Sequence, residues 1–339
     1  MSTLHYDNPI ARRIVSRLRS LLFFITTSEP KNTISLTSRS ARLFTGSFES
    51  AIYLLSSICS VPQHTSVLPA INTNFTNHIS AGLANGTTIT GQNSISHPSE
   101  STALDNSTTV PSHSSETSDH DAIEDANLPG SLPTLRKQYI NFSKADEDDL
   151  PARIERLWYI NPYGQEIRLA ANPRVLDALN DAHAIIYSIG SLYTSLIPSL
   201  ILKGVGAAIA NPSIRHKTLI LNSTNDRETG PSTSPFSALD FIAAIAKACA
   251  ESRGLVGDVE KFDYRCYVTH LIYVAGPGTP IVETEELQKL GIEAIRVYGR
   301  KVEGEGFVRY DEKALVQALQ VTMGRDPRAE RVRRNTLEG

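Results

Sequence analysis

The segment whose residues are best suited to bind a ligand runs from Ser188 to Ser195 and contains one glycine and several residues with hydroxyl side chains. An apolar run typical of a buried parallel strand precedes it, and a helical pattern follows it. The start of a helix presents unpaired N–H groups and a partial positive charge, which suit phosphate, and Gly190 allows a ligand to approach the backbone closely. We therefore expect phosphate to bind here, and ordinary turn and helix capping is the alternative. The further polar groups of the segment are the hydroxyls of Ser191, Thr194 and Ser195 and the phenol of Tyr193.

A second polar loop begins at Asn222 and follows the next apolar run, Thr218 to Leu221. Ligands of an open parallel sheet bind at the carboxyl ends of its strands, so both loops are expected to border one crevice. The carboxylate of Asp226 or Glu228 could bind Mg²⁺ or orient a hydroxyl group. The alternative is a solvated loop that binds nothing.

The other residues of chemical interest are isolated. His78 and His97 have no visible partner, and a lone histidine is more often structural or exposed than catalytic. The cysteines Cys59, Cys249 and Cys266 show neither metal-ligand nor redox spacing, which predicts inert thiols in a reducing compartment. The segment from Gly276 to Gly278 is typical of a turn.

Composition excludes two classes of partner. The chain has 339 residues, and its 33 basic and 36 acidic residues leave a net charge of only −3. Without a basic stripe, this balance argues against nucleic acid. No apolar run approaches the roughly 20 residues of a spanning helix, so no membrane partner is expected either.

Residues 1–40 form a basic segment that is poor in acidic residues, with an amphipathic helix expected at about Ile10 to Ile25. Such a composition is also typical of a mitochondrial transit peptide. We expect a cytoplasmic protein, with a mitochondrial location as the alternative.

From Trp158 onward, strand-like and helix-like patterns alternate. This predicts an α/β fold with a Rossmann-like, mostly parallel sheet in three layers, covered by helices on both faces. The expected strands are Trp158–Ile160, Ala184–Ser188, Thr218–Leu221, Val268–Val274 and Ala294–Val297. The first expected helix follows the cap Asn172 and carries Val175, Leu176, Leu179 and His183 on one face. The later ones are Leu196–Ala210, Ala238–Ala250, Glu283–Leu290 and Asp311–Thr322.

The domain is expected in two parts. Residues 41–98 form the first part, with a helix at Phe48–Ile58 and a turn between short strands at Leu83–Gln92. Residues 99–134 are rich in Ser and Thr and cannot bury enough apolar surface to fold, which predicts a disordered insertion. Residues 135–325 form the second part, and residues 326–339 form a charged tail.

The order of motifs from Ala171 to Gly206 closely resembles the family of 2-phospho-lactate transferases and bacterial gluconeogenesis factors, the CofD-like and YvcK-like proteins. The family's Asn-Pro before a helix is here Asn172-Pro173, and its Gly-Ser-Leu-Tyr-Thr-Ser is Gly190 to Ser195, followed by Pro198 and Leu200. Its Asn and Gly-Glu-Thr after the next strand are matched by Asn222 and Glu228-Thr229, with Arg227 in place of the glycine. More weakly, Phe44–Ile58 resembles a family helix, and Val67–Pro69 with Gly91–Pro98 resembles a pair of strands.

The chain departs from the family pattern in two places. The family opens with a strand and a Gly-rich turn, followed by an Asp-Asp-Gly-Gly loop that is expected to hold metal and part of the nucleotide. None of these is recognisable in residues 1–40, so the first βα unit is expected to be missing or replaced. Ile189 also replaces the proline usual before Gly190, a change that the fold tolerates.

The resemblance implies an enzyme that transfers a phospho-lactyl-type group from a nucleotide diphosphate donor to an acceptor hydroxyl, with Mg²⁺ as cofactor. It implies no particular catalytic residue. It assigns the phosphates to Gly190, Ser191, Thr194 and Ser195, the orientation of the acceptor or base to Tyr193 and Asn222, and the lining of the crevice to Glu228 and Thr229.

Two other functions stay open. A non-catalytic, nucleotide-sugar-binding regulator of carbon metabolism, similar to the gluconeogenesis factors, fits a crevice without the metal loop better. A truncated chain without function would expose a sheet edge where the first strand is missing. The sequence also leaves open whether the protein is a homodimer.

Overall fold

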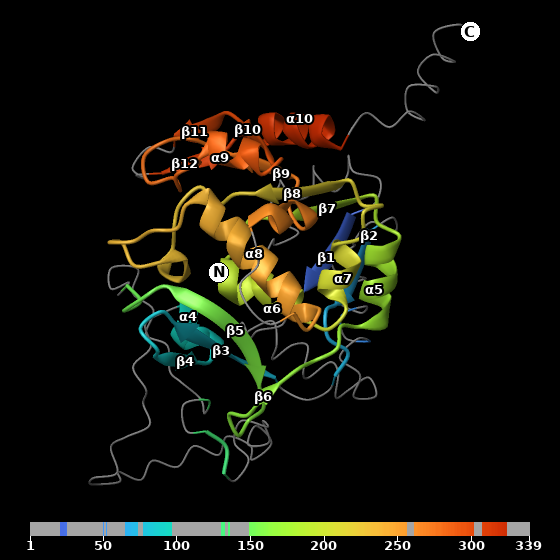
Figure 1. The fold of residues 1–339 in the computed structure, drawn as a ribbon, viewed down its shortest axis with the longest axis vertical. Helices are drawn as coiled ribbons and strands as arrows, with labels where there is room; N and C mark the ends of the chain where they lie inside the picture. The colour runs from blue at the N-terminus through green and yellow to red at the C-terminus, as the bar shows by residue number, and fades with distance from the viewer. Residues whose placement is uncertain are drawn as a thin grey trace, which may run out of the picture.

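The structure is a computed structural model that describes residues 21–25, 50, 52, 65–73, 77–96, 130–132, 135, 149–255, 261–301 and 307–323. Figure 1 shows its elements stacked in layers, with a parallel sheet between helices and a second sheet beyond them.

The parallel sheet has the strand order β10-β9-β8-β7. Its strands, which are neighbours both in the chain and in the sheet, are β7 (Ala184–Tyr187), β8 (His216–Ile220), β9 (His270–Tyr273) and β10 (Glu293–Arg296). All pairs are parallel, for example Ala184 with His216 and Thr218 with His270. Their carboxyl ends therefore lie at one edge of the sheet, where the chain leaves β7 at Ser188 and β8 at Leu221.

Helices cover both faces of this sheet because its strands are apolar on both sides. Leu219 and Leu271 pack in the larger core with α6 (Ile197–Leu200), α7 (Val205–Ile209), α8 (Ala238–Ser252) and α9 (Thr284–Lys289). Ile220 and Ile272 face the opposite way and pack against α10 (Glu312–Thr322) and the hairpin of β11 (Gly299–Lys301) and β12 (Val308–Tyr310). The predicted three-layer α/β fold is confirmed (Figure 1).

A second, antiparallel sheet has the order β4-β3-β5-β6. Its strands are β3 (His78–Leu83), β4 (Thr88–Thr90), β5 (Ile154–Ile160) and β6 (Glu166–Ile167). β5 contacts α6 and α8, so this sheet lies beyond the helices that cover the parallel sheet (Figure 1). The turn between β3 and β4 contains Gly86 at φ 83°, as the sequence predicted.

A strand occupies part of the segment in which a helix was expected. β1 (Leu21–Ile25) pairs in parallel with β2 (Thr65–Pro69), so the predicted helix over Ile10 to Ile25 is wrong at its end. Residues 1–40 therefore contain a strand, β1, that the sequence did not predict. Five consecutive apolar residues fit a buried parallel strand as well as a helix face, which is why the pattern misled. No glycine occurs between β1 and Gly46, so the Gly-rich turn and the Asp-Asp-Gly-Gly loop do not follow this strand.

Most other predicted elements are confirmed within one to four residues at their ends. In α5 (Pro173–Asn180), the Asn172 side chain accepts a hydrogen bond from the Arg174 N–H, and Pro173 is the first helical residue. Asp311 caps α10 through the Ala314 N–H at 3.0 Å. Asn161 to Gly164 and Gly276 to Gly278 form turns, as expected.

Three local predictions are wrong. The single helix expected over Leu196–Ala210 is divided into α6 and α7, because Gly204 adopts a left-handed conformation with φ 94°. His183 lies beyond the end of α5 and is exposed, so it does not share the helix face with Leu179. The strand expected after Gly91 is the helix α4 (Gln92–Ser96), with Ile95 buried. The hairpin of β11 and β12 was not predicted.

Some predictions fall outside the described residues: those on His97, on Cys59, on residues 326–339, and on nearly all of residues 99–134 and Phe48–Ile58. Ser50 and Ile52 are described and helical. Cys249 is buried and Cys266 exposed, both as free thiols. Within the described part of the chain, no helix is long and apolar enough to cross a membrane.

Candidate functional site

The loop after β7 leads into a helix that begins at the predicted phosphate-binding segment. Residues Leu192–Leu196 form a π-helical turn that continues into α6. Ser191 holds the cap position, yet its side chain makes no capping hydrogen bond. Helix capping was the alternative explanation for the hydroxyl residues of this segment. It does not explain the Ser191 hydroxyl, because that hydroxyl makes no capping hydrogen bond.

The N–H groups at the start of this helix are bound by a carboxylate of the protein itself. Glu228 Oε2 accepts hydrogen bonds from the N–H groups of Tyr193 at 2.9 Å and Thr194 at 3.0 Å. Its Oε1 accepts from the Thr194 hydroxyl at 2.5 Å. Glu228 is only 1% exposed. The favourable place for an anion at a helix start is thus taken by Glu228, which joins the loop after β7 to the loop after β8.

Asp226 fixes the position of Glu228. Its Oδ1 accepts hydrogen bonds from the N–H groups of Glu228 and Thr229, both at 3.1 Å, and from the Thr229 hydroxyl at 2.9 Å. In return, the Thr229 hydroxyl accepts from the Asp226 N–H at 2.8 Å. This reciprocal capping box folds Arg227–Thr229 into a short 3-10 turn that points the Glu228 side chain at the helix start.

A further hydrogen bond links the two loops closer to the strand ends. Asn222 Nδ2 donates to the carbonyl of Gly190 at 2.9 Å. The Asn225 side chain donates to the carbonyl of Phe236 at 3.0 Å and so ties its own loop to the start of α8. The two polar loops therefore lie together at the carboxyl edge of the sheet, in the arrangement expected from the sequence.

Tyr193 lies in the core rather than at the surface of this edge. Its hydroxyl donates to the carbonyl of Ile154 in β5 at 2.9 Å, and its ring packs edge-on against Phe236 with centroids 6.2 Å apart. Burial raises the pKa of the phenol well above its usual value. Tyr193 thus holds the helix against the antiparallel sheet in this structure.

The predicted site residues divide into two groups by exposure. Tyr193, Thr194, Glu228 and Thr229 are buried and bonded to one another or to the core. Gly190, Ser191 and Asn222 are half-buried and Ser195 is exposed. These last four are the members of the predicted set that a ligand can reach without rearrangement of the fold.

Sequence reasoning missed Arg153, which holds the end of the second loop. Its guanidinium donates to the carbonyls of Ser234 at 3.0 Å and Pro235 at 2.7 Å and pairs with Asp240 at 3.1 Å. It also lies 4.8 Å from the centroid of the Phe236 ring. All of these partners are more than 80 residues away in the sequence, so no local pattern could indicate the interaction.

Glu228 should make stability depend on pH. Burial, and secondly the neighbouring Asp226 carboxylate, raise the pKa of Glu228 from 4.5 to about 7. Because the folded state then binds the proton more tightly than the unfolded state, the contribution is present at low pH and is lost as pH rises through 7. We expect the stability of the wild type relative to Glu228→Gln, measured by urea unfolding, to be greater at pH 5 than at pH 8. If the stability of the wild type relative to Glu228→Gln is the same at both pH values, or greater at pH 8, the raised pKa of Glu228 is contradicted.

The described residues of this edge do not fit a metal site. Both oxygens of Glu228 are used by the three donors above, and Asp226 Oδ1 by three more. Magnesium prefers several free carboxylate or water oxygens in octahedral geometry. Among the residues that the structure describes, no group of three or more His, Cys, Asp or Glu side chains could hold a metal ion.

A parallel sheet covered by helices, with linked polar loops at its carboxyl edge, defines a Rossmann-like α/β protein. The family model described as "2-phospho-L-lactate transferase CofD" matches residues 33–327. The chain therefore belongs to the CofD family.

Curated relatives agree with this assignment. An uncharacterised protein of Saccharomyces cerevisiae is 38% identical over 268 residues, which cover 72% of this chain and 59% of that protein. A "Putative gluconeogenesis factor" of Clostridium acetobutylicum is 28% identical over 156 residues, 44% of this chain and 32% of that protein. The chain thus spans less than two thirds of the length of these relatives.

The fold also resembles a crystal structure of a UPF0052-family protein from Bacillus halodurans. The TM-score is 0.51 at 21% sequence identity, over 84% of this chain and 70% of that one. At this identity the likeness concerns the fold alone.

Proposed function

We propose that the protein is a CofD-like transferase that binds a nucleotide diphosphate donor at the carboxyl edge of β7 and β8. The observation that carries the proposal is the Ser191 hydroxyl, which lies half-buried at the start of the helix after β7 and makes no capping hydrogen bond. Around it, Gly190, Ser195 and Asn222 offer backbone, hydroxyl and amide groups at the same edge. Neutral donors of this kind suit diphosphate oxygens.

In the proposed reaction, the donor carries a phospho-lactyl-type group on the far side of its diphosphate. The oxygen of the acceptor hydroxyl forms a new bond to the distal phosphorus while the bond from that phosphorus to the bridging oxygen breaks. A nucleoside monophosphate leaves with the bridging oxygen, and the hydroxyl proton passes to a base. Catalysis of this kind depends on positioning and charge stabilisation, which the hydroxyl and amide groups of the two loops would supply to the phosphate oxygens.

A non-catalytic regulator that binds a nucleotide sugar is the second candidate. It is favoured by one observation: the carboxylate of Glu228, which joins the two loops, is buried and both its oxygens accept hydrogen bonds, so it offers no base to the acceptor. The relative from Clostridium acetobutylicum whose name is "Putative gluconeogenesis factor" also fits this candidate. Incubation of the protein with guanosine- or uridine-diphosphate-activated donors and hydroxyl acceptors separates the two. Release of nucleoside monophosphate supports the transferase, and saturable binding without release supports the regulator.

The Ser191 hydroxyl is expected to contact the diphosphate directly. We predict that Ser191→Ala weakens the binding of guanosine or uridine diphosphate by about 1–3 kcal/mol, because a phosphate oxygen loses its donor. Isothermal titration calorimetry measures the loss. Ser213→Ala is the matched control, since Ser213 is exposed at the opposite edge of the sheet, in the turn before β8. Unchanged affinity in Ser191→Ala would remove Ser191 from the site.

The Mg²⁺ expected from the resemblance stays a prediction. The described residues of this edge offer no metal site of their own, so Mg²⁺ would be carried by the phosphates of the nucleotide, and we expect EDTA to weaken nucleotide binding and Mg²⁺ to restore it. Calorimetric titration of the nucleotide with and without EDTA measures the effect. Equal affinity under both conditions would show that binding does not need the metal.

A further inference from the structure

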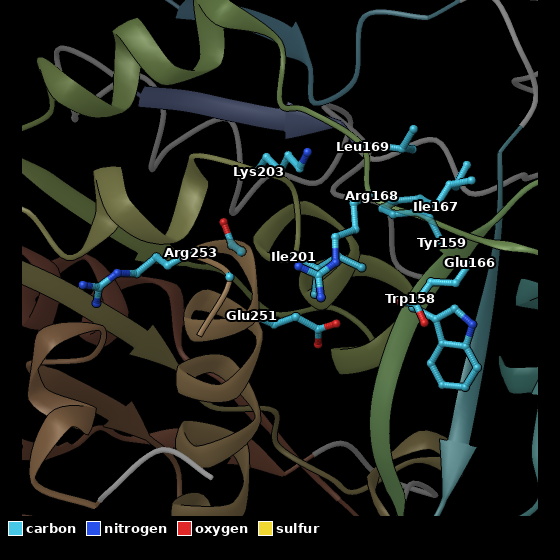
Figure 2. Close-up of a pocket in the computed structure, with 12 residues that line it drawn as sticks. Trp158, Tyr159, Glu166, Ile167, Arg168, Leu169, Ile201, Lys203, Glu251 and Arg253 are labelled. Carbon is cyan, nitrogen blue, oxygen red and sulfur yellow. The ribbon is translucent and has the colours of Figure 1, made fainter. Parts of the chain in front are cut away.

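Ionisable side chains from different elements come together at two places away from the carboxyl edge of the parallel sheet. The first is a cavity of about 290 Å³ between the antiparallel sheet and the end of α8. Figure 2 shows the charged ends of Arg168, Lys203 and Arg253 at this cavity pointing in different directions, so they form no common site for a ligand. The second place is the amino edge of the parallel sheet, where ionisable side chains lie against one another.

The amino edge carries an ionisable residue at the start of three neighbouring strands. His216 begins β8, His270 begins β9 and Glu293 begins β10. Side chains alternate between the two faces along a strand, so His216 lies on the same face as Ile220, and His270 on the same face as Ile272. That is the face covered by α10.

The two imidazole rings lie beside each other. Their centroids are 5.6 Å apart, and their planes are tilted by 33°. The side chain of His270 is only 15% exposed. Nδ1 of His216 is buried and has no hydrogen-bond partner among the residues that the structure describes. A positive charge on His270 would therefore lie next to the His216 ring, where water reaches it only in part.

A hydroxyl group connects the His270 ring to the neighbouring strand. Thr269 Oγ1 lies 2.8 Å from Nδ1 of His270, accepts from the Lys217 N–H at 2.8 Å and lies 3.3 Å from the Lys217 carbonyl. Nε2 of His270 lies 3.8 Å from a carboxylate oxygen of Glu293, which favours the neutral tautomer with its proton on Nε2. In that tautomer, the Thr269 hydroxyl donates to Nδ1.

Protonation of His270 would change this arrangement. The Thr269 hydroxyl has a single proton, and an Nδ1 that carries its own proton can no longer accept it. The hydroxyl must then turn to the Lys217 carbonyl, which is the more distant of its two acceptors. The proton on His270 therefore alters the contacts between the starts of β8 and β9.

The surroundings of His270 favour its neutral form. Burial lowers the pKa of His270 below its ordinary value of 6.5, the Glu293 carboxylate opposes this, and His216 and Arg265 lower the pKa further. Arg265 belongs to the 3-10 helix Lys261–Cys266 that precedes β9. The single carboxylate is therefore outweighed by burial and the two neighbouring basic groups.

The other two elements beside the histidine pair are β7 and α10. β7 places Ala184 opposite His216. The last turn of α10, Leu319–Thr322, contains no charged side chain. These two elements thus offer no carboxylate that could stabilise a proton on either ring.

We propose that His216 and His270 form an acid-sensitive switch at the amino edge of the parallel sheet, which holds the starts of β8 and β9 together while His270 is neutral and loosens them when His270 takes up a proton. Because the folded state binds this proton more weakly than the unfolded chain, the stabilisation is present above pH 6.5 and is lost as the pH falls below that value. The sign is opposite to that of Glu228, which lies at the carboxyl edge.

Urea unfolding at pH 7.5 and at pH 5 tests the switch. We expect the urea midpoint of the wild type to lie above that of His270→Gln at pH 7.5 and to approach it at pH 5, because glutamine cannot take up the proton. Comparison of the two proteins at each pH removes the contribution of Glu228, which both contain. His183→Gln, which replaces an exposed histidine just before β7, is the control and should show the pH dependence of the wild type.

NMR titration of the histidine side chains measures the same proton in the intact protein. We expect His270 to titrate below pH 6.5 in the wild type and closer to pH 6.5 in His216→Gln, because the His216 ring is one of the groups that lower its pKa. Titration of His270 at or above pH 6.5 in the wild type would overturn the proposal. So would a difference in urea midpoint between the wild type and His270→Gln that is the same at both pH values. If His270→Gln does not fold, the NMR titration decides alone.

Discussion

Glu228→Ala is expected to lower the free energy of unfolding by about 3–5 kcal/mol. The substitution leaves three buried donors, the N–H groups of Tyr193 and Thr194 and the Thr194 hydroxyl, without their acceptor. Each buried donor without a partner costs about 1–3 kcal/mol. The site is almost inaccessible to solvent, so water replaces the carboxylate only in part. Urea unfolding at pH 7 measures the loss.

Glu228→Gln is the matched control for this prediction. The glutamine keeps the volume of the side chain, its oxygen can accept from both N–H groups, and its NH₂ can donate to the Thr194 hydroxyl. We expect it to cost only about 1 kcal/mol. If alanine and glutamine cost the same, Glu228 would not hold the two loops together through these hydrogen bonds.

Gly206→Ala is expected to destabilise the protein by more than about 3 kcal/mol or to prevent folding. A Cβ atom at Gly206 would lie 1.9 Å from the carbonyl oxygen of Cys249, in the backbone of α8. The Gly206 N–H also donates to the Ser252 hydroxyl at 2.9 Å, so α7 and α8 cannot separate without losing that bond. Alanine favours a helix over glycine by only about 1 kcal/mol, which is too little to offset the clash. Thermal and urea unfolding measure the effect.

Gly190→Ala serves as the control for glycine replacement. A Cβ atom there would lie 3.5 Å from the Cβ of Ser195, an ordinary contact, and the stability should change by less than about 1 kcal/mol. A Gly206→Ala variant as stable as Gly190→Ala would mean that α7 and α8 do not pack as closely as described.

The sequence predicted the parallel sheet well because its signals are local. Short apolar runs followed by polar turns indicated β7, β8, β9 and β10 within a few residues, and the Asn172 cap indicated α5. The break at Gly204 was missed because a glycine inside a helical pattern does not by itself reveal a left-handed conformation. β1 was missed because an apolar run of only five residues fits a buried strand as well as one face of a helix.

The candidate site was predictable only in part. The sequence indicated that the loops after β7 and β8 would meet, since strand ends of a parallel sheet share one edge. It did not indicate that the Glu228 carboxylate binds the start of the helix after β7, 34 residues away in the sequence.

A thermal melt of the whole chain, alone and with Mg²⁺ plus guanosine or uridine diphosphate, tests the nucleotide site most directly. A ligand at about 100 times its dissociation constant stabilises the folded state by about 2.7 kcal/mol, or several degrees for a protein of this size. We predict a cooperative melt that shifts upward with one of the two nucleotides and shifts less in Ser191→Ala. A melt that is unchanged by both nucleotides would contradict a nucleotide diphosphate site at the carboxyl edge of β7 and β8.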